Sequence, residues 1–117
     1  MYYYNMEIRE NDKICIFTPL ASMLDKNESK RLFELLNSET RKIAIDLCNV
    51  NDCSIDFIFD LKDFLSGKKL GIFNIQSDIF VLFNTMNIDK IAELFVSEID
   101  FISEKRQLLK RNFKLVY

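Results

Sequence analysis

Ile43-Ala44-Ile45-Asp46-Leu47-Cys48 is the stretch that decides the fold. It is short, rich in β-branched residues and mostly apolar, which is typical of a central strand buried on both faces of a sheet. One helical pattern precedes it, another follows it, and further apolar strands come later in the chain. Because strands that alternate with helices form parallel sheets with right-handed crossovers, the sequence predicts an α/β protein.

The other elements are predicted from turn, capping and spacing signals. Met6–Arg9 and Lys13–Thr18 form a hairpin across Glu10-Asn11-Asp12, and Thr18-Pro19 ends the strand pairing because proline has no amide donor. The later elements are a helix that starts at Asp25, directs Leu32, Phe33, Leu35 and Leu36 inward and closes near Ser38; a helix from Ser54 to Ser66; strands at Leu70–Ile75 and Ala92–Val96; and helices from Ser77 to Asn84 and from Ser97 onward. The predicted fold is a single domain over residues 1–117, with a mixed, mostly parallel sheet and about four helices in the order β-β-α-β-α-β-α-β-α.

Composition excludes several classes of protein. The chain has no histidine, which removes the Ser-His-Asp and Cys-His nucleophile systems and the commonest transition-metal ligand. Its cysteines, Cys15, Cys48 and Cys53, have no C-x-x-C spacing, so neither a disulfide framework nor a zinc site is expected. The sequence also contains no P-loop and no Gly-rich dinucleotide turn. We therefore expect a protein that is not an enzyme and that holds no metal or cofactor.

Charge and hydropathy bear on partners and compartment. Sixteen basic and eighteen acidic residues give a net charge of −2, which provides no case for nucleic-acid binding. No apolar run approaches the roughly 20 residues of a membrane span, and Met1–Asn5 lack the basic and apolar regions of a signal peptide. The cysteine pattern suits a reducing compartment. The sequence thus predicts a cytoplasmic protein without membrane insertion.

Both ends of the chain have an unusual composition. Residues 105–117 carry five basic side chains and no acid, and they are predicted as a basic extension of the last helix. A solvated helix end is the simpler interpretation, and a docking or anionic-membrane surface is the alternative. The apolar residues Phe113 and Leu115–Tyr117 either fold back onto the sheet or contribute to a homodimer. Tyr2–Tyr4 either cover one end of the core or pair the hairpin edge with a second copy.

The segment Asn49–Ile58 joins the central strand to the next helix, and Asn49–Cys53 is predicted as a loop. Sites in parallel α/β sheets form at the carboxyl ends of strands, where this loop lies. Ser54 is predicted at or near the first helical residue, where free amides and the helix dipole favour a phosphate by about 0.3–1 kcal/mol. An acidic stripe at helical spacing, predicted on the outward face, consists of Asp56, Asp60 and Asp63. The alternative interpretation is that Ser54 is only an N-cap and that the stripe only solubilises the helix.

Several stretches, spread in order over nearly the whole chain, follow the pattern of one family. They are Ser22-Met23-Leu24-Asp25 with the helix Asn27–Leu36, similar to a G-x-L-D segment and first helix; Lys42–Val50, similar to a vvlDls-V strand; Asp52-Cys53-Ser54, where the family has Asp-Ser-Ser-Gly; Gly71–Ile75, similar to an l-l-v-g-v strand; and Phe83–Ile91, similar to an L-x-x-t-g-l-d-k-l stretch. In these stretches the chain resembles a STAS domain. That module occurs in anti-sigma-factor antagonists and in sulfate-transporter tails.

The resemblance implies a partner-switching regulator of transcription. The unphosphorylated domain would bind a serine-kinase-like anti-sigma factor, and phosphorylation at the start of the second helix would release it. Ser54 is the position that corresponds to the phosphoacceptor, and Asp52 corresponds to the acid that precedes it. A phosphate adds about −1.5 to −2 charge, so it would make an acidic docking face repulsive. The residues that this predicts at the partner interface are Asp52, Cys53, Ser54, Ile55, Asp56, Phe57 and Asp60.

The chain differs from the family in the same loop. Cys53 replaces the first serine of the pair, and Ile55 and Phe57 occupy the positions of two glycines. Glycine lets a partner backbone approach closely, whereas isoleucine is bulky. The differences favour a second hypothesis, a constitutive STAS-like scaffold without phosphorylation. STAS domains of this kind serve as subunits of signalling assemblies or of lipid-transport ATPases.

Overall fold

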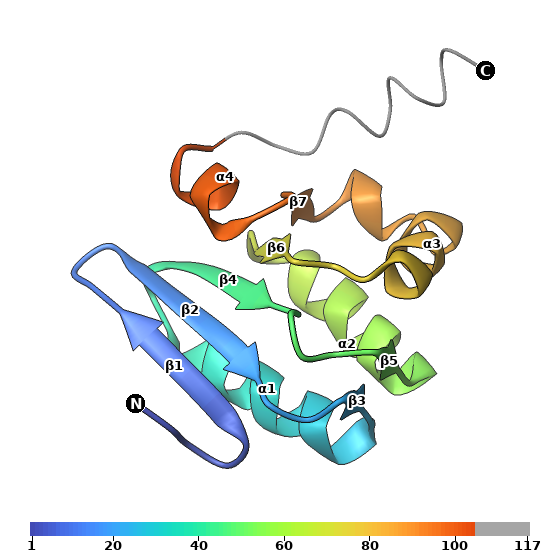
Figure 1. The fold of residues 1–117 in the computed structure, drawn as a ribbon, viewed down its shortest axis with the longest axis horizontal. Helices are drawn as coiled ribbons and strands as arrows, with labels where there is room; N and C mark the ends of the chain where they lie inside the picture. The colour runs from blue at the N-terminus through green and yellow to red at the C-terminus, as the bar shows by residue number, and fades with distance from the viewer. Residues whose placement is uncertain (105–117) are drawn as a thin grey trace.

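The computed structural model describes residues 1–104, in which helices pack on a five-stranded sheet of order β1-β2-β4-β6-β7 (Figure 1). Strands β1 (Met6–Glu10) and β2 (Ile14–Pro19) form an antiparallel hairpin, and β2 then pairs in parallel with β4 (Lys42–Asp46). Strands β6 (Gly71–Phe73) and β7 (Glu93–Leu94) continue the parallel pairing. The predicted class, an α/β domain with a mixed, mostly parallel sheet and four helices, is confirmed.

The helices divide unequally between the two faces of the sheet. Helices α1 (Lys26–Ser38), α2 (Ile55–Leu65) and α3 (Ser77–Thr85) pack on one face, and α4 (Glu98–Ile102) packs on the other (Figure 1). The central strand β4 shows the division, since Ile45 joins the cluster under the three helices and Ala44 joins the cluster under α4. Both residues have no exposed surface, as expected for a strand covered on both sides.

Two helices begin where the sequence predicts a cap. The carboxylate of Asp25 accepts a hydrogen bond of 2.9 Å from the amide of Glu28 at the start of α1. The hydroxyl of Ser97 accepts one of 3.3 Å from the amide of Asp100 at the start of α4. Side-chain caps satisfy amides that have no partner within the helix, which is why these positions are readable from sequence.

Several elements differ from the prediction. The later strands are shorter than the apolar runs that predict them, and a short 3-10 helix, η1 (Ile88–Lys90), was not predicted. Asn49–Cys53 is not entirely a loop, because it ends in β5 (Asp52–Cys53), which pairs in parallel with β3 (Met23–Leu24). This two-stranded sheet joins segments far apart in sequence, so no local pattern indicates it.

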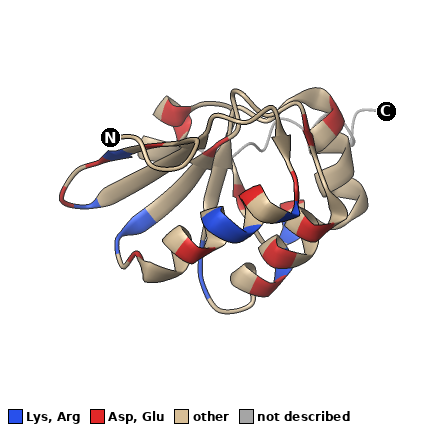
Figure 2. Cartoon of the chain, turned by 90° about the horizontal axis from the view of Figure 1, so that it is seen from below, with Lys and Arg blue, Asp and Glu red and all other residues tan. Residues whose placement is uncertain are grey.

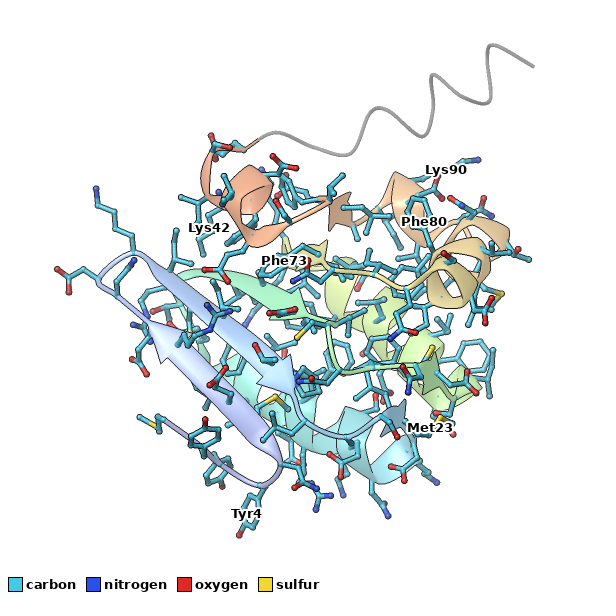
Figure 3. The ribbon with its side chains drawn as sticks, in the orientation of Figure 1. Tyr4, Met23, Lys42, Phe73, Phe80 and Lys90 are labelled. Atoms are coloured by element: carbon cyan, nitrogen blue, oxygen red, sulfur yellow. The ribbon has the colours of Figure 1, made fainter. Side chains whose placement is uncertain are left out.

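The first residues of the chain pair with the edge of the sheet. Tyr2 forms a bridge with Glu7, and the amide of Tyr3 donates to the carbonyl of Met6 at 2.7 Å. Tyr4 turns the chain with a φ of 46° and lies beside β1 in Figure 3. The rings of Tyr2, Tyr3 and Tyr4 are 47–70% exposed, so the expectation that they cover one end of the core is wrong. The backbone of Met1–Tyr3 instead shields the β1 edge, as natural sheets commonly require.

None of the helices formed by residues 1–104 has the length and apolar character needed to cross a bilayer. The residues predicted as a basic extension, 105–117, lie outside the described part of the chain.

Candidate protein-interaction site

Ser54 is the N-cap of helix α2, as the sequence predicts. Its backbone is extended, and both its hydroxyl and its carbonyl oxygen accept from the amide of Phe57, at 3.4 and 3.1 Å. The residue is half-buried at the N-terminal end of the helix. Serine is among the preferred N-cap residues because a short side-chain oxygen reaches the free amides of the first turn.

The loop before Ser54 is held by the small second sheet. The amides of Asn51 and Asp52 donate to the carbonyl of Ser22, at 2.7 and 3.2 Å, and the amide of Ser54 donates to the carbonyl of Leu24 at 2.9 Å. The side chain of Asn51 also accepts a 2.6 Å hydrogen bond from Gln76 at the start of α3. These bonds hold the loop against two other segments of the chain, so the position of Ser54 is fixed by hydrogen bonds on the residues before it.

Two of the predicted interface residues lie in the core. Cys53 is 8% exposed, and burial, together with the nearby carboxylate of Asp52, raises the pKa of its thiol to about 11. Phe57 has no exposed surface and packs against Phe33 and Phe83, with ring centroids 5.8 and 6.4 Å away. Side chains alternate along β5, so turning Asp52 outward turns Cys53 inward. Neither Cys53 nor Phe57 offers a partner an exposed surface.

The start of α2 is surrounded by exposed apolar side chains. Ile55 is 51% exposed and Phe59, one turn further along the helix, is 58% exposed. Met23 is 39% exposed and lies opposite Asp52 in the β3–β5 pairing (Figure 3). We call Met23, Ile55 and Phe59 the α2 patch. The prediction missed Met23 and Phe59. The spacing of Phe59 four residues after Ile55, away from the inward stripe of Ile58, Leu61 and Phe64, was the signal that could have found it.

The acidic stripe of α2 faces a neighbouring helix, so its predicted outward position is wrong for most of its length. Asp56 and Asp60 are half-buried, and the hydroxyl of Ser29 on α1 donates to Asp60 at 2.7 Å. Both acidic and basic positions are coloured on the helices in Figure 2. Together α1 and α2 border a groove of about 660 Å³ whose lining includes Asp56, Asp60, Asp63, Lys26, Lys30, Phe33 and Phe64. The sequence misplaces the stripe because α1 packs beside α2, on the side predicted to face water.

The site therefore combines the half-buried N-cap Ser54, the exposed residue Asp52 and the exposed side chains of the α2 patch, next to a loop held by hydrogen bonds. No group of three His, Cys, Asp or Glu side chains within residues 1–104 is arranged to hold a metal ion. No protein-family model matches the chain, and no curated protein matches its sequence. The resemblance to STAS domains consequently stays a prediction from the sequence motifs.

Proposed function

We propose that this chain is a non-enzymatic regulatory domain that resembles an anti-sigma-factor antagonist and binds a serine-kinase-like anti-sigma partner through the start of α2. The observation that carries the proposal is the placement of Ser54 as the half-buried N-cap of α2, beside the exposed side chains of Met23, Ile55 and Phe59. Clustered exposed apolar side chains mark interaction surfaces, and aromatic anchors dominate their binding energy. The docking surface is the α2 patch together with Asp52 and Ser54.

Phosphorylation of Ser54 would act on this surface through charge. A phosphate carries about −1.5 to −2 charge, and it would stand between the carboxylates of Asp52 and Asp56. The positive end of α2 favours the anion within the free protein. A partner that covers the patch would have to desolvate the same anion, which is costly. Phosphate would therefore weaken the complex more than it affects the free domain, which is the behaviour of a release switch.

A constitutive scaffold is the second candidate, and a specific observation favours it. A kinase would have to reach Ser54 beside the bulky side chain of Ile55, in a loop that is hydrogen-bonded to Ser22 and Leu24. In this version the α2 patch binds a subunit of a larger assembly permanently. Ser54 then serves only to cap the helix.

Substitution of Ser54 separates the two candidates. Ser54→Asp adds charge and keeps a good N-cap residue, whereas Ser54→Ala removes the cap without adding charge. The matched control is Ser97→Asp, which changes the N-cap of α4 on the opposite face of the sheet. In a switch, Ser54→Asp lowers the amount of partner captured from host lysate at least about tenfold, equivalent to about 1.4 kcal/mol. Ser54→Ala and Ser97→Asp retain the partner.

The mass of the protein purified from its own host supplies an independent readout. One phosphatase-sensitive phosphate mapped to Ser54 supports the switch. An unmodified Ser54 during both growth and stress, with equal capture by Ser54→Asp and Ser54→Ala, supports the scaffold. Ile55→Asn with Phe59→Asn tests the surface itself. If this double variant captures the same partners as the unaltered chain, the α2 patch is not the docking surface in either version.

A further inference from the structure

Helix α4 is anchored on one side and bare on the other. On the inner side, Phe101 has no exposed surface and packs against Phe73 and Phe95, with ring centroids 5.7 and 5.4 Å away. On the outer side, Ile99 is 77% exposed and Ile102 is 53% exposed, and Val96 just before the helix is 53% exposed. We call Val96, Ile99 and Ile102 the α4 surface. Residues 99 and 102 lie on the same side of the helix, so the exposed methyl groups form one patch.

The segment that carries the α4 surface is acidic, and two of its carboxylates, those of Glu98 and Glu104, pair with Arg9 and Lys42 from the neighbouring strands. Residues 91–104 contain no lysine or arginine, and their four acids are Glu93, Glu98, Asp100 and Glu104. The acids outnumber these two cations, so the surface favours a covering segment that is both apolar and basic. Residues 105–117, which follow directly, have that composition. Their five basic residues come with no acid, and their apolar residues are Leu108, Leu109, Phe113, Leu115, Val116 and Tyr117.

The backbone at the end of α4 changes direction just before this segment. Glu104 has a φ of 60°, and its amide donates to the carbonyl of Phe101 at 3.1 Å. A left-handed residue after a helix cap turns the chain away from the helix axis, and it is unfavourable for a residue with a Cβ. The carboxylate of Glu104 also pairs with the amine of Lys42 on β4, at 3.0 Å.

We propose that residues 105–117 dock on the α4 surface of the same chain, with their apolar side chains on Val96, Ile99 and Ile102 and their cations beside the surrounding carboxylates. The segment is long enough, since thirteen extended residues span up to about 45 Å and α4 is about 7.5 Å long. Direct covalent connection also gives a high effective concentration, so modest contacts suffice. Docking removes an exposed apolar patch from the face opposite the α2 patch and leaves Ser54 free.

Carbodiimide cross-linking of the full chain tests this proposal, because the reagent joins a lysine to a carboxylate in contact with it. Equal amounts of unlabelled and nitrogen-15-labelled chains are mixed before the reaction, and the linked peptides are identified by mass spectrometry. We expect Lys110 and Lys114 to link to Glu98 and Asp100 within chains of one isotope. Peptides that pair the two isotopes would overturn the proposal in favour of docking on a second copy.

Three double variants control for proximity along the sequence. Ile99→Asn with Ile102→Asn should lower the yield of these links about tenfold, corresponding to about 1.4 kcal/mol of docking free energy. Ile55→Asn with Phe59→Asn, the same change on the α2 patch, should leave the yield unchanged. Leu108→Asn with Leu109→Asn changes only residues beyond the described domain and should reproduce the loss. Links from Lys110 and Lys114 spread evenly over remote exposed acids such as Asp52, Asp63 and Asp78 would refute docking.

Discussion

The two faces of the sheet bury apolar cores of different size. We call the face under α1, α2 and α3 the deep face and the face under α4 the shallow face. Under α1, α2 and α3, one large buried cluster includes the ring of Phe33, which packs against the rings of Phe57 and Phe64. Under α4, the buried apolar cluster consists of Ile16, Ala44, Phe73, Phe95 and Phe101. A helix of five residues cannot bury much on its own, and isolated short helices are unstable in water. The attachment of α4 to the sheet therefore depends on the buried side chain of Phe101 and on ion pairs at the two ends of the helix.

The difference assigns different roles to the two faces. Ser54, Ile55 and Phe59 belong to or cap a helix whose inner side is part of the large core, which suits a surface recognised in one conformation. Helix α4 has few buried neighbours, so it should open locally at a lower free energy than the rest of the domain. A substitution on the deep face should consequently change the free energy of unfolding of the whole protein. A substitution on the shallow face should change mainly the free energy of local opening of α4.

Removal of one aromatic ring from each face gives the largest expected effect. Phe57→Ala should lower the free energy of unfolding by about 3–5 kcal/mol, because it leaves a cavity among fully buried rings. Phe101→Ala should cost less, since its loss is limited by the free energy that holds α4 in place. Urea denaturation measures the global change, and hydrogen exchange of the α4 amides measures the local one. Equal global losses from both variants would contradict the comparison.

The glycine beneath α4 offers a sharper test of the shallow face. A Cβ at Gly71 would lie 2.6 Å from the ring of Phe101, so Gly71→Ala should displace the ring and cost about 1–3 kcal/mol. Gly67 is the matched control, because nothing lies within 4 Å of a Cβ there and its φ is not positive. Gly67→Ala should be neutral or stabilise by about 0.4–1 kcal/mol through the unfolded chain. Thermal unfolding of both variants distinguishes these outcomes, and equal stability would show that α4 does not rest on Gly71.

The part of this architecture that sequence predicts is the part set by local patterns. Alternating apolar runs identify the strands, helical spacing identifies the inward faces of α1 and α2, and capping residues such as Asp25, Ser54 and Ser97 identify helix starts. The capping positions succeed because the side chain bonds to an amide only three residues away. The same signal places Ser54 at the N-terminal end of α2 without any tertiary information.

The rest depends on contacts between distant segments. The β3–β5 pairing, which buries Cys53 and exposes Met23, joins residues about thirty positions apart. The acidic stripe turns toward α1 because the two helices pack side by side, and a helical pattern on one segment does not show which neighbour it meets. Gly71 has no positive φ, so backbone conformation does not require a glycine there. A glycine is needed because the ring of Phe101 occupies the space that a Cβ would take. Each of these features depends on packing between distant segments, which a local sequence pattern does not indicate.

The two serine caps compare the faces at a smaller scale. Ser54→Ala should lower global stability by about 1 kcal/mol, because α2 belongs to the deep core and its N-terminal amides lose a partner. Ser97→Ala removes the equivalent bond from α4, and we expect faster exchange of the α4 amides with little global change. Urea denaturation and hydrogen exchange on both variants provide the measurement. A global loss from Ser97→Ala as large as that from Ser54→Ala would mean that α4 unfolds only with the whole domain.

The smallest expected effect concerns the ion pair that ties α4 to the hairpin. Arg9 Nη2 lies 2.7 Å from Glu98 Oε1, and the bond to Glu98 is the main reason that the pKa of Arg9 is raised. Both side chains are more than a third exposed, so Glu98→Gln should cost under about 1 kcal/mol. Arg9 keeps its contacts with Asp46 and Glu7 in this variant, which avoids leaving the buried carboxylate of Asp46 without its cation.

The contribution of the Arg9–Glu98 ion pair can also be measured without mutation, by raising the salt concentration. Raising the salt concentration from about 0.05 M to about 1 M shortens the screening length from roughly 14 Å to about 3 Å, so the exposed pair weakens. Exchange of the α4 amides should accelerate, whereas exchange of the buried α2 amides should hardly change. The response should become smaller in Glu98→Gln, which leaves the Lys42–Glu104 pair in place, and persist in full in Glu34→Gln, which removes an exposed carboxylate from α1. An equal response in α2 and α4 would mean that salt acts on the whole domain, and the shallow face would then have no special dependence on charge.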